Sequence, residues 1–184
     1  MRPDGACASP AVATYNAAMI RLRPYYLFTV FRQLDAGDRP ADDNSLPQIT
    51  ARLAAGGFQE DIRLVRGFCD ACEGCAHMQA DPAGCLWGEG YRCASTATAK
   101  RLNQVEDQMR SILYDLEMTF GQHMRADKLL RRAAERRPFH YFHLPDWQAA
   151  YERGVRRFAD LTGLRPEVPA DLLAQRKHYF RDDD

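Results

Sequence analysis

The sequence has no long apolar run, no secretory start and no net charge. A membrane-spanning helix needs about 18 or more consecutive apolar residues, and no such run is present. Residues 1–18 lack the basic start and continuous apolar stretch of a secretory signal. The 25 basic side chains equal the 25 acidic ones, so charge does not attract the chain to nucleic acid or to an acidic membrane. We therefore expect a soluble, cytoplasmic protein with no membrane association and no non-specific affinity for nucleic acid.

The sequence also lacks the short motifs of several common enzyme classes. It contains no glycine-rich phosphate loop, no Ser-His-Asp arrangement with a local signature and no His-Glu-x-x-His. Whether the chain is an enzyme is therefore left open. Its 184 residues are 46% hydrophobic. A chain of that size and composition can bury a core, so a bound metal need not be its only source of stability.

Cysteine is scarce outside one region of the chain. Five of the six cysteines lie within one glycine-rich stretch: Cys69, Cys72, Cys75, Cys85 and Cys93. In a reducing compartment, clustered thiols are more typical of metal or redox sites than of structural disulfides. The glycines let a loop bend several side chains toward one centre. We predict that a metal centre draws its ligands from these five thiols, whereas Cys7 is a bystander in a mobile leader.

The spacing of the thiols favours an iron–sulfur cluster over zinc. The first three cysteines of the stretch form a Cys-x-x-Cys-x-x-Cys run, which is typical of [4Fe–4S] clusters with a remote fourth ligand. Structural zinc sites commonly use two Cys-x-x-Cys pairs, but Cys85 and Cys93 are separated by seven residues. Zinc is the alternative, with His77 available as a substitute ligand. Five thiols are one more than either site needs.

Hydrophobic periodicity predicts a mostly helical α+β fold with two short paired strands and a cysteine-rich metal loop. Residues 19–23 and 61–66 alternate apolar and charged side chains, and both contain Ile-Arg-Leu, which predicts that they pair. Helical spacing, caps and stops predict five to six helices. These cover residues 25–34, 45–55, 99–120, 128–137, 147–161 and 169–180. We expect Ser45 to cap the second helix and Gly121 to end the third.

The layout resembles a family of small uncharacterised bacterial proteins that are regarded as iron–sulfur binders. The family pattern opens with Leu-Arg-Pro-His-His-Leu-Leu-Cys and continues with an Ile-x-Leu-Val strand, a Cys-x-x-Cys, a further Cys and a helix with an Asp-rich middle. The matching segments lie between residues 19 and 137: Leu22-Arg-Pro-Tyr-Tyr-Leu-Phe-Thr29, Ile62-Arg-Leu-Val65, the cysteines at 72, 75 and 85, and residues 105–113. The resemblance implies cluster binding. Tyr25, Tyr26 and Thr29 replace the histidines and cysteine of the opening, and Cys69 and Cys93 are then candidate replacement ligands.

Three parts are expected: a flexible leader at 1–18, a metal-binding core at 19–137 and a helical extension at 138–184 packed on the core. The leading function is iron–sulfur cluster binding, in electron transfer or in an accessory role in a redox or metal-handling pathway, which implies a protein redox partner. The alternative is a zinc-stabilised module whose basic helices dock a protein or RNA partner. Seven arginines make those helices basic: Arg131, Arg132, Arg136, Arg137, Arg153, Arg156 and Arg157. Such a run is usually a solvated helix face.

Overall fold

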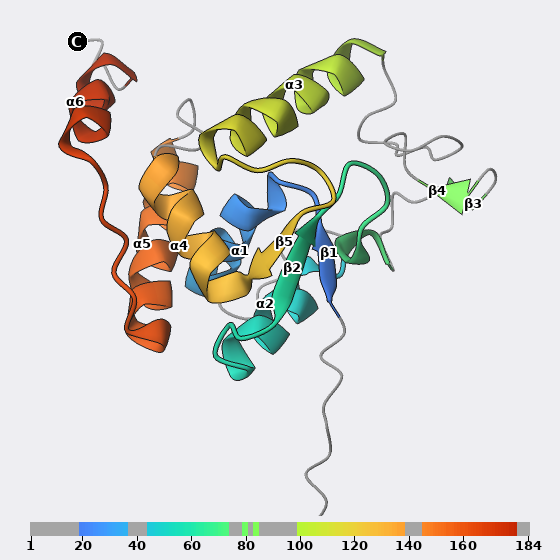
Figure 1. The fold of residues 1–184 in the computed structure, drawn as a ribbon, viewed down its shortest axis with the longest axis horizontal. Helices are drawn as coiled ribbons and strands as arrows, with labels where there is room; N and C mark the ends of the chain where they lie inside the picture. Colours follow the sequence, from blue (N-terminus) through green and yellow to red (C-terminus); the bar gives the residue numbers. More distant parts are fainter. Residues whose placement is uncertain are drawn as a thin grey trace, which may run out of the picture.

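A three-stranded sheet lies at the centre of the fold, with helices around it (Figure 1). The computed structural model describes residues 19–36, 44–73, 79–80, 83–84, 99–138 and 145–179. The elements of the sheet and the helices are β1 (Ile20–Leu22), α1 (Tyr26–Ala36), α2 (Leu46–Ala55), β2 (Asp61–Leu64), the 3-10 helix η1 (Asp70–Cys72), α3 (Ala99–Asp115), β5 (His123–Arg125), α4 (Ala126–Arg136), α5 (Pro145–Thr162) and α6 (Ala170–Tyr179). A separate short hairpin joins β3 (Gln79–Ala80) to β4 (Ala83–Gly84). The predicted mostly helical α+β fold is confirmed.

The two predicted strands pair with each other in parallel. Ile20 lies opposite Ile62 and Leu22 lies opposite Leu64, so the two Ile-Arg-Leu segments align residue for residue. The isoleucines and leucines are buried while the arginines between them point outward, which is the alternation of a sheet with one covered face. A third strand, β5, pairs antiparallel with β2. The sequence analysis did not predict this strand.

The third helix ends earlier than predicted, at Asp115 rather than at residue 120. The Met118 N–H donates to the Leu113 carbonyl at 2.9 Å, and Glu117 adopts a φ of 51°, so the chain turns away from the helix axis. Gly121 has a φ of 89°, and its N–H donates to the Leu64 carbonyl at 2.7 Å. Gly121 therefore directs the chain toward β5 instead of stopping a helix.

The second helix begins where expected, but its start is capped differently. Ser45 occupies the N-cap position without making a side-chain capping bond. The Asn44 carboxamide oxygen instead accepts a hydrogen bond from the Leu46 N–H at 2.8 Å. The Ser45 hydroxyl donates to the Glu73 carbonyl, just after η1. The start of α2 is thereby tied to the cysteine turn.

Helix α5 packs chiefly against α1, and its aromatic side chains complete the main core. Phe31 on α1 meets the Tyr151 ring edge-on, with centroids 5.3 Å apart, and meets the Phe158 ring edge-on at 5.6 Å. Phe58, which follows α2, packs on Phe158 at 5.1 Å. Edge-to-face pairs at these distances add to the stability gained from burial. The C-terminal segment thus supplies part of the core that covers the sheet.

No helix in the described part of the chain combines the length and the apolar character that a membrane span requires.

The contact between α1 and α5 generates a stability prediction at Gly154. A Cβ atom added there would lie 1.8 Å from the Phe31 carbonyl oxygen, which is backbone and cannot rotate away. We expect Gly154→Ala to force the helices apart and to lower the free energy of unfolding by about 3 kcal/mol. For a chain of this size the thermal midpoint should fall by about 6–12 °C.

Gly56→Ala is the matched control for this substitution. Gly56 has a φ of −84°, and an added Cβ would meet its nearest neighbour, the Arg52 carbonyl oxygen, at 3.4 Å. This substitution should leave the thermal midpoint unchanged or raise it slightly. Equal midpoints for the two variants in a calorimetric scan would contradict the close crossing of α1 and α5.

Candidate thiol site

The candidate site lies where the two parallel strands end. Because β1 and β2 run in the same direction, the residues that follow them emerge at the same edge of the sheet. Arg23 follows β1 and precedes α1, whereas Cys69 and Cys72 follow β2 in a turn that contains η1. Strand pairing therefore brings together an arginine and two thiols that are more than 40 residues apart in sequence.

Arg23 is the buried cation of this site, with an exposed fraction of 2%. Its guanidinium donates hydrogen bonds to the Gly67 carbonyl oxygen at 2.9 Å, to the Tyr25 hydroxyl at 2.9 Å and to Cys72 Sγ at 3.5 Å. Burial of a guanidinium is costly unless acceptors surround it. A guanidinium beside a sulfur also favours the thiolate, which is the form that binds metals.

Cys69 and Cys72 are free thiols that face each other in the protein interior. Their exposed fractions are 0% and 5%, and their Sγ atoms are 3.4 Å apart. The Cys72 N–H donates to the Cys69 carbonyl at 2.8 Å, which closes the turn and keeps both side chains on one side. The structure thus brings together the first two of the five predicted ligands.

A salt bridge holds the cysteine turn against the sheet. Asp70, between the two thiols, accepts hydrogen bonds from the Arg21 backbone N–H at 2.8 Å and from its Nε at 2.8 Å. The Arg21 Nη2 atom lies 2.8 Å from the same carboxylate. On the other side of the turn, the Ser45 N–H donates to the Ala71 carbonyl at 3.1 Å. The turn is therefore fixed both to β1 and to the start of α2.

The Cys69 thiol and the two neighbouring phenols, Tyr25 and Tyr26, are shifted toward their neutral forms. A hydrogen bond with Cys72 and then burial raise the pKa of the Cys69 thiol well above its ordinary value. Burial raises the pKa of both Tyr25 and Tyr26, although the Arg23 guanidinium opposes the shift at each hydroxyl. Burial therefore outweighs the attraction of the Arg23 guanidinium for negative charge at both hydroxyls.

The remaining predicted ligands lie outside the described residues: Cys75, Cys85, Cys93 and the substitute ligand His77. The bystander Cys7 lies outside them as well. Among the residues that the structure describes, no group of three or more potential metal-binding side chains converges. The prediction that one metal centre draws its ligands from the five thiols therefore stays a prediction, and the structure places only Cys69 and Cys72 in contact.

Tyr25 and Tyr26 lie beside the thiol pair. These tyrosines stand where the family opening has histidines, and the hydroxyl of Tyr25 shares the Arg23 guanidinium with Cys72. Thr29, at the position of the family cysteine, is buried in α1.

Sequence motifs did not identify two contributors to the site, Arg23 and Asp70. Arg23 lies in the Arg-Pro of the family-like opening, and Asp70 lies inside the first Cys-x-x-Cys. Motif spacing does not reveal a buried cation, because the burial of Arg23 depends on the turn that folds over it. The sequence feature that could have indicated Arg23 is its position directly after an Ile-Arg-Leu strand.

Most of the arginines in the predicted basic helices are engaged within the chain. Four form salt bridges: Arg131 with Glu135, Arg136 with Glu117, Arg137 with Asp115 and Arg153 with Asp35. Arg132 donates to the Leu116 carbonyl oxygen at 3.0 Å. Arg156 and Arg157 have no such partner in the described part of the chain. Five of the seven arginines are therefore engaged by groups within the described part of the chain.

Comparison with known proteins found no matching family model and no significant match among curated proteins or solved structures. The function of the site is therefore argued from its own geometry.

The raised pKa values generate a prediction about alkaline stability. Above pH ~10 the unfolded chain loses phenol protons that the folded chain keeps, so the free energy of unfolding falls as the pH rises. Below the ordinary pKa both states keep these protons, and stability is unaffected. We expect Tyr26→Phe to make the decline above pH ~10 shallower by up to about 1.4 kcal/mol per pH unit. Denaturant titrations between pH 7 and pH 11 measure this slope.

Tyr114→Phe is the control, because Tyr114 is 84% exposed on α3. The control variant should decline with the same slope as the unmodified protein. A Tyr26→Phe slope identical to that of Tyr114→Phe would show that the Tyr26 hydroxyl is not buried beside the thiols.

Proposed function

We propose that this chain binds a thiolate metal centre that starts from Cys69 and Cys72, and that iron–sulfur binding is its function. The observation that carries the proposal is the burial of both thiols in contact, with Sγ atoms 3.4 Å apart and Arg23 beside Cys72. A filled thiolate centre carries net negative charge, and a buried guanidinium would compensate it. The residues present therefore fit a metal centre.

The distance between the sulfurs bears on the type of centre. Two thiolates that bind one zinc at about 2.3 Å in a tetrahedron lie about 3.8 Å apart, close to the observed 3.4 Å. Two thiolates that bind one iron of a [2Fe–2S] cluster also lie at a short distance from each other. In a [4Fe–4S] cluster, by contrast, each thiolate binds a different iron. The pair geometry thus favours a centre in which Cys69 and Cys72 share one metal atom. The Cys-x-x-Cys-x-x-Cys spacing favours a [4Fe–4S] cluster, and binding of that cluster would require the Sγ atoms of Cys69 and Cys72 to move apart.

Zinc is the second candidate, and the same short distance supports it. A zinc centre would make the thiol site structural, and the function would then lie elsewhere on the surface. An iron–sulfur centre would imply electron transfer or an accessory role in redox or metal handling, with a protein redox partner. Either centre requires reduced thiols, so the proposal includes a cytoplasmic location.

Anaerobic purification followed by absorbance spectroscopy and metal analysis distinguishes the two centres. We expect a coloured protein with absorbance at about 400 nm and stoichiometric iron and sulfide, since thiolate-bound iron absorbs in the visible range. A colourless protein with one zinc per chain would contradict the iron–sulfur assignment. A protein that holds neither metal would contradict the whole proposal.

Substitution of individual thiols tests which residues bind the metal. Cys69→Ser and Cys72→Ser should each abolish stoichiometric metal, because a hydroxyl is a much weaker ligand than a thiolate. Asp70→Ala should weaken metal binding by about tenfold, because it releases the turn that orients both thiols. Cys7→Ser is the control and should keep the full metal content. Full metal content in Cys72→Ser would show that the buried pair is not part of the centre.

A further inference from the structure

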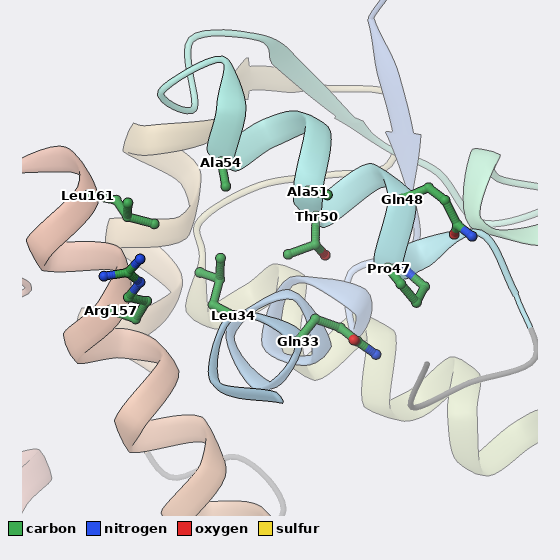
Figure 2. Close-up of a pocket in the computed structure, with 9 residues that line it drawn as sticks. All are labelled: Gln33, Leu34, Pro47, Gln48, Thr50, Ala51, Ala54, Arg157 and Leu161. Atoms are coloured by element: carbon green, nitrogen blue, oxygen red, sulfur yellow. The ribbon is translucent and has the colours of Figure 1, made fainter. Parts of the chain in front are cut away.

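A second site lies away from the thiols, in a groove between α1, α2 and α5 (Figure 2). Its volume is about 440 Å³, within the range of small-molecule sites in proteins. Leu34 lies between the helices, while Arg157 and Leu161 approach from α5. The remaining described lining residues come from one face of α2 and from α1: Gln33, Pro47, Gln48, Thr50, Ala51 and Ala54.

Two side chains that line the groove are buried without hydrogen-bond partners. Gln33 is 2% exposed, and neither its carboxamide nitrogen nor its carboxamide oxygen has a partner. Thr50 is 4% exposed, and its hydroxyl oxygen is also unpartnered. A threonine inside a helix can bond back to the carbonyl four residues earlier, but Thr50 does not. Buried polar groups in native proteins are nearly always paired, so a ligand that bonds to these atoms would use hydrogen-bonding capacity that the described chain leaves unfilled.

The charge at the groove favours a ligand that carries negative charge. Arg157 is exposed at the groove and has no ion-pair partner within the described part of the chain, whereas the neighbouring Arg153 is paired with Asp35. The described residues that line the groove include no carboxylate. An anionic group would therefore be attracted to the α5 side of the groove.

The apolar wall of the groove favours a ligand whose middle part is aliphatic. Leu34, Ala51, Ala54 and Leu161 line the groove, and Leu161 is 40% exposed. In Figure 2 Leu34, Ala54 and Leu161 lie on the side of the groove that Arg157 approaches, while Gln33 and Pro47 lie on the other side. A short aliphatic chain would cover them and remove their surface from water.

We propose that this groove binds a small organic carboxylate that carries an amide or hydroxyl group at the far end of a short apolar chain. The carboxylate pairs with Arg157, the chain covers the aliphatic wall, and the polar end bonds to Gln33 and Thr50. A primary carboxamide both donates and accepts, so it complements the Gln33 carboxamide at both of its atoms.

The test uses a series of probes on the full chain, with binding measured by calorimetry and by protein NMR. The probes are succinamate, glutaramate and adipamate, which join a carboxylate to a primary amide through two to four methylenes. Hexanoate lacks the amide and hexanamide lacks the carboxylate. We expect the best amido acid to bind about tenfold more tightly than either of these, which corresponds to one well-made buried hydrogen bond or ion pair.

Three variants assign the contacts to the ends of the probe. Gln33→Leu and Thr50→Val should remove the advantage of the amido acid over hexanoate. Both should also raise the thermal midpoint of the free protein, because each removes an unpaired buried polar group. Arg157→Gln should weaken every carboxylate about tenfold but leave hexanamide unchanged. The matched control is Arg156→Gln, an exposed neighbour on the same helix that lines a different cavity and should bind all probes normally.

Three results would overturn the proposal. One is the absence of binding tighter than about 10 mM for every amido acid, which would mean that water fills the groove. Another is amido-acid binding that survives both Gln33→Leu and Thr50→Val, because the amide would then lie elsewhere. The third is an equal loss in Arg156→Gln and Arg157→Gln, which would show general charge attraction instead of a site. None of these results depends on the metal content of the protein.

Discussion

The parallel pairing of β1 with β2 is the constraint on which the described structure depends. Alignment of two identical Ile-Arg-Leu segments buries one face of each strand and sets both strands in the same direction. The connection between them must therefore cross over, and helices α1 and α2 form that crossover. The same direction brings the ends of both strands to one edge, where Arg23 meets the cysteine turn. A slip of one residue would expose the isoleucines and separate this pair.

The buried guanidinium of Arg23 then determines the chemistry of that edge. A cation inside a protein requires acceptors on several sides, and here they are a carbonyl, a phenol and a sulfur. The two tyrosine hydroxyls and the Cys69 thiol are shifted toward their neutral forms. The Cys72 sulfur accepts a hydrogen bond from this guanidinium. An anionic centre built on this pair would find its counter-charge already in place.

Helix α2 contributes to both candidate sites. Its start contacts the cysteine turn through Ser45, and its middle presents Thr50 to the groove. The unpaired carboxamide of Gln33 and hydroxyl of Thr50 destabilise the free protein. Sequences that keep such groups at a buried position usually gain something other than stability from them. The groove and the thiol turn therefore both contain buried polar groups.

Local patterns account for what the sequence determined about this protein. Alternation identified both strands and helical spacing identified the helices, because these periods are properties of short segments. The Cys-x-x-Cys spacing likewise identified the thiol pair, because three residues of turn suffice to bring the sulfurs together. The end of α3 was misjudged because Glu117 adopts a backbone conformation that its side chain does not reveal.

Tertiary structure alone decided the direction of the strand pairing, the third strand, the burial of Arg23 and the groove. The third strand, His123–Arg125, is too short to show an alternation and forms because β2 offers it a free edge. Gln33 and Thr50 look like ordinary helix residues until α1, α2 and α5 enclose them. Periodicity reports which face of a segment is buried, whereas the identity of the atoms across that face depends on contacts between segments that are distant in the chain.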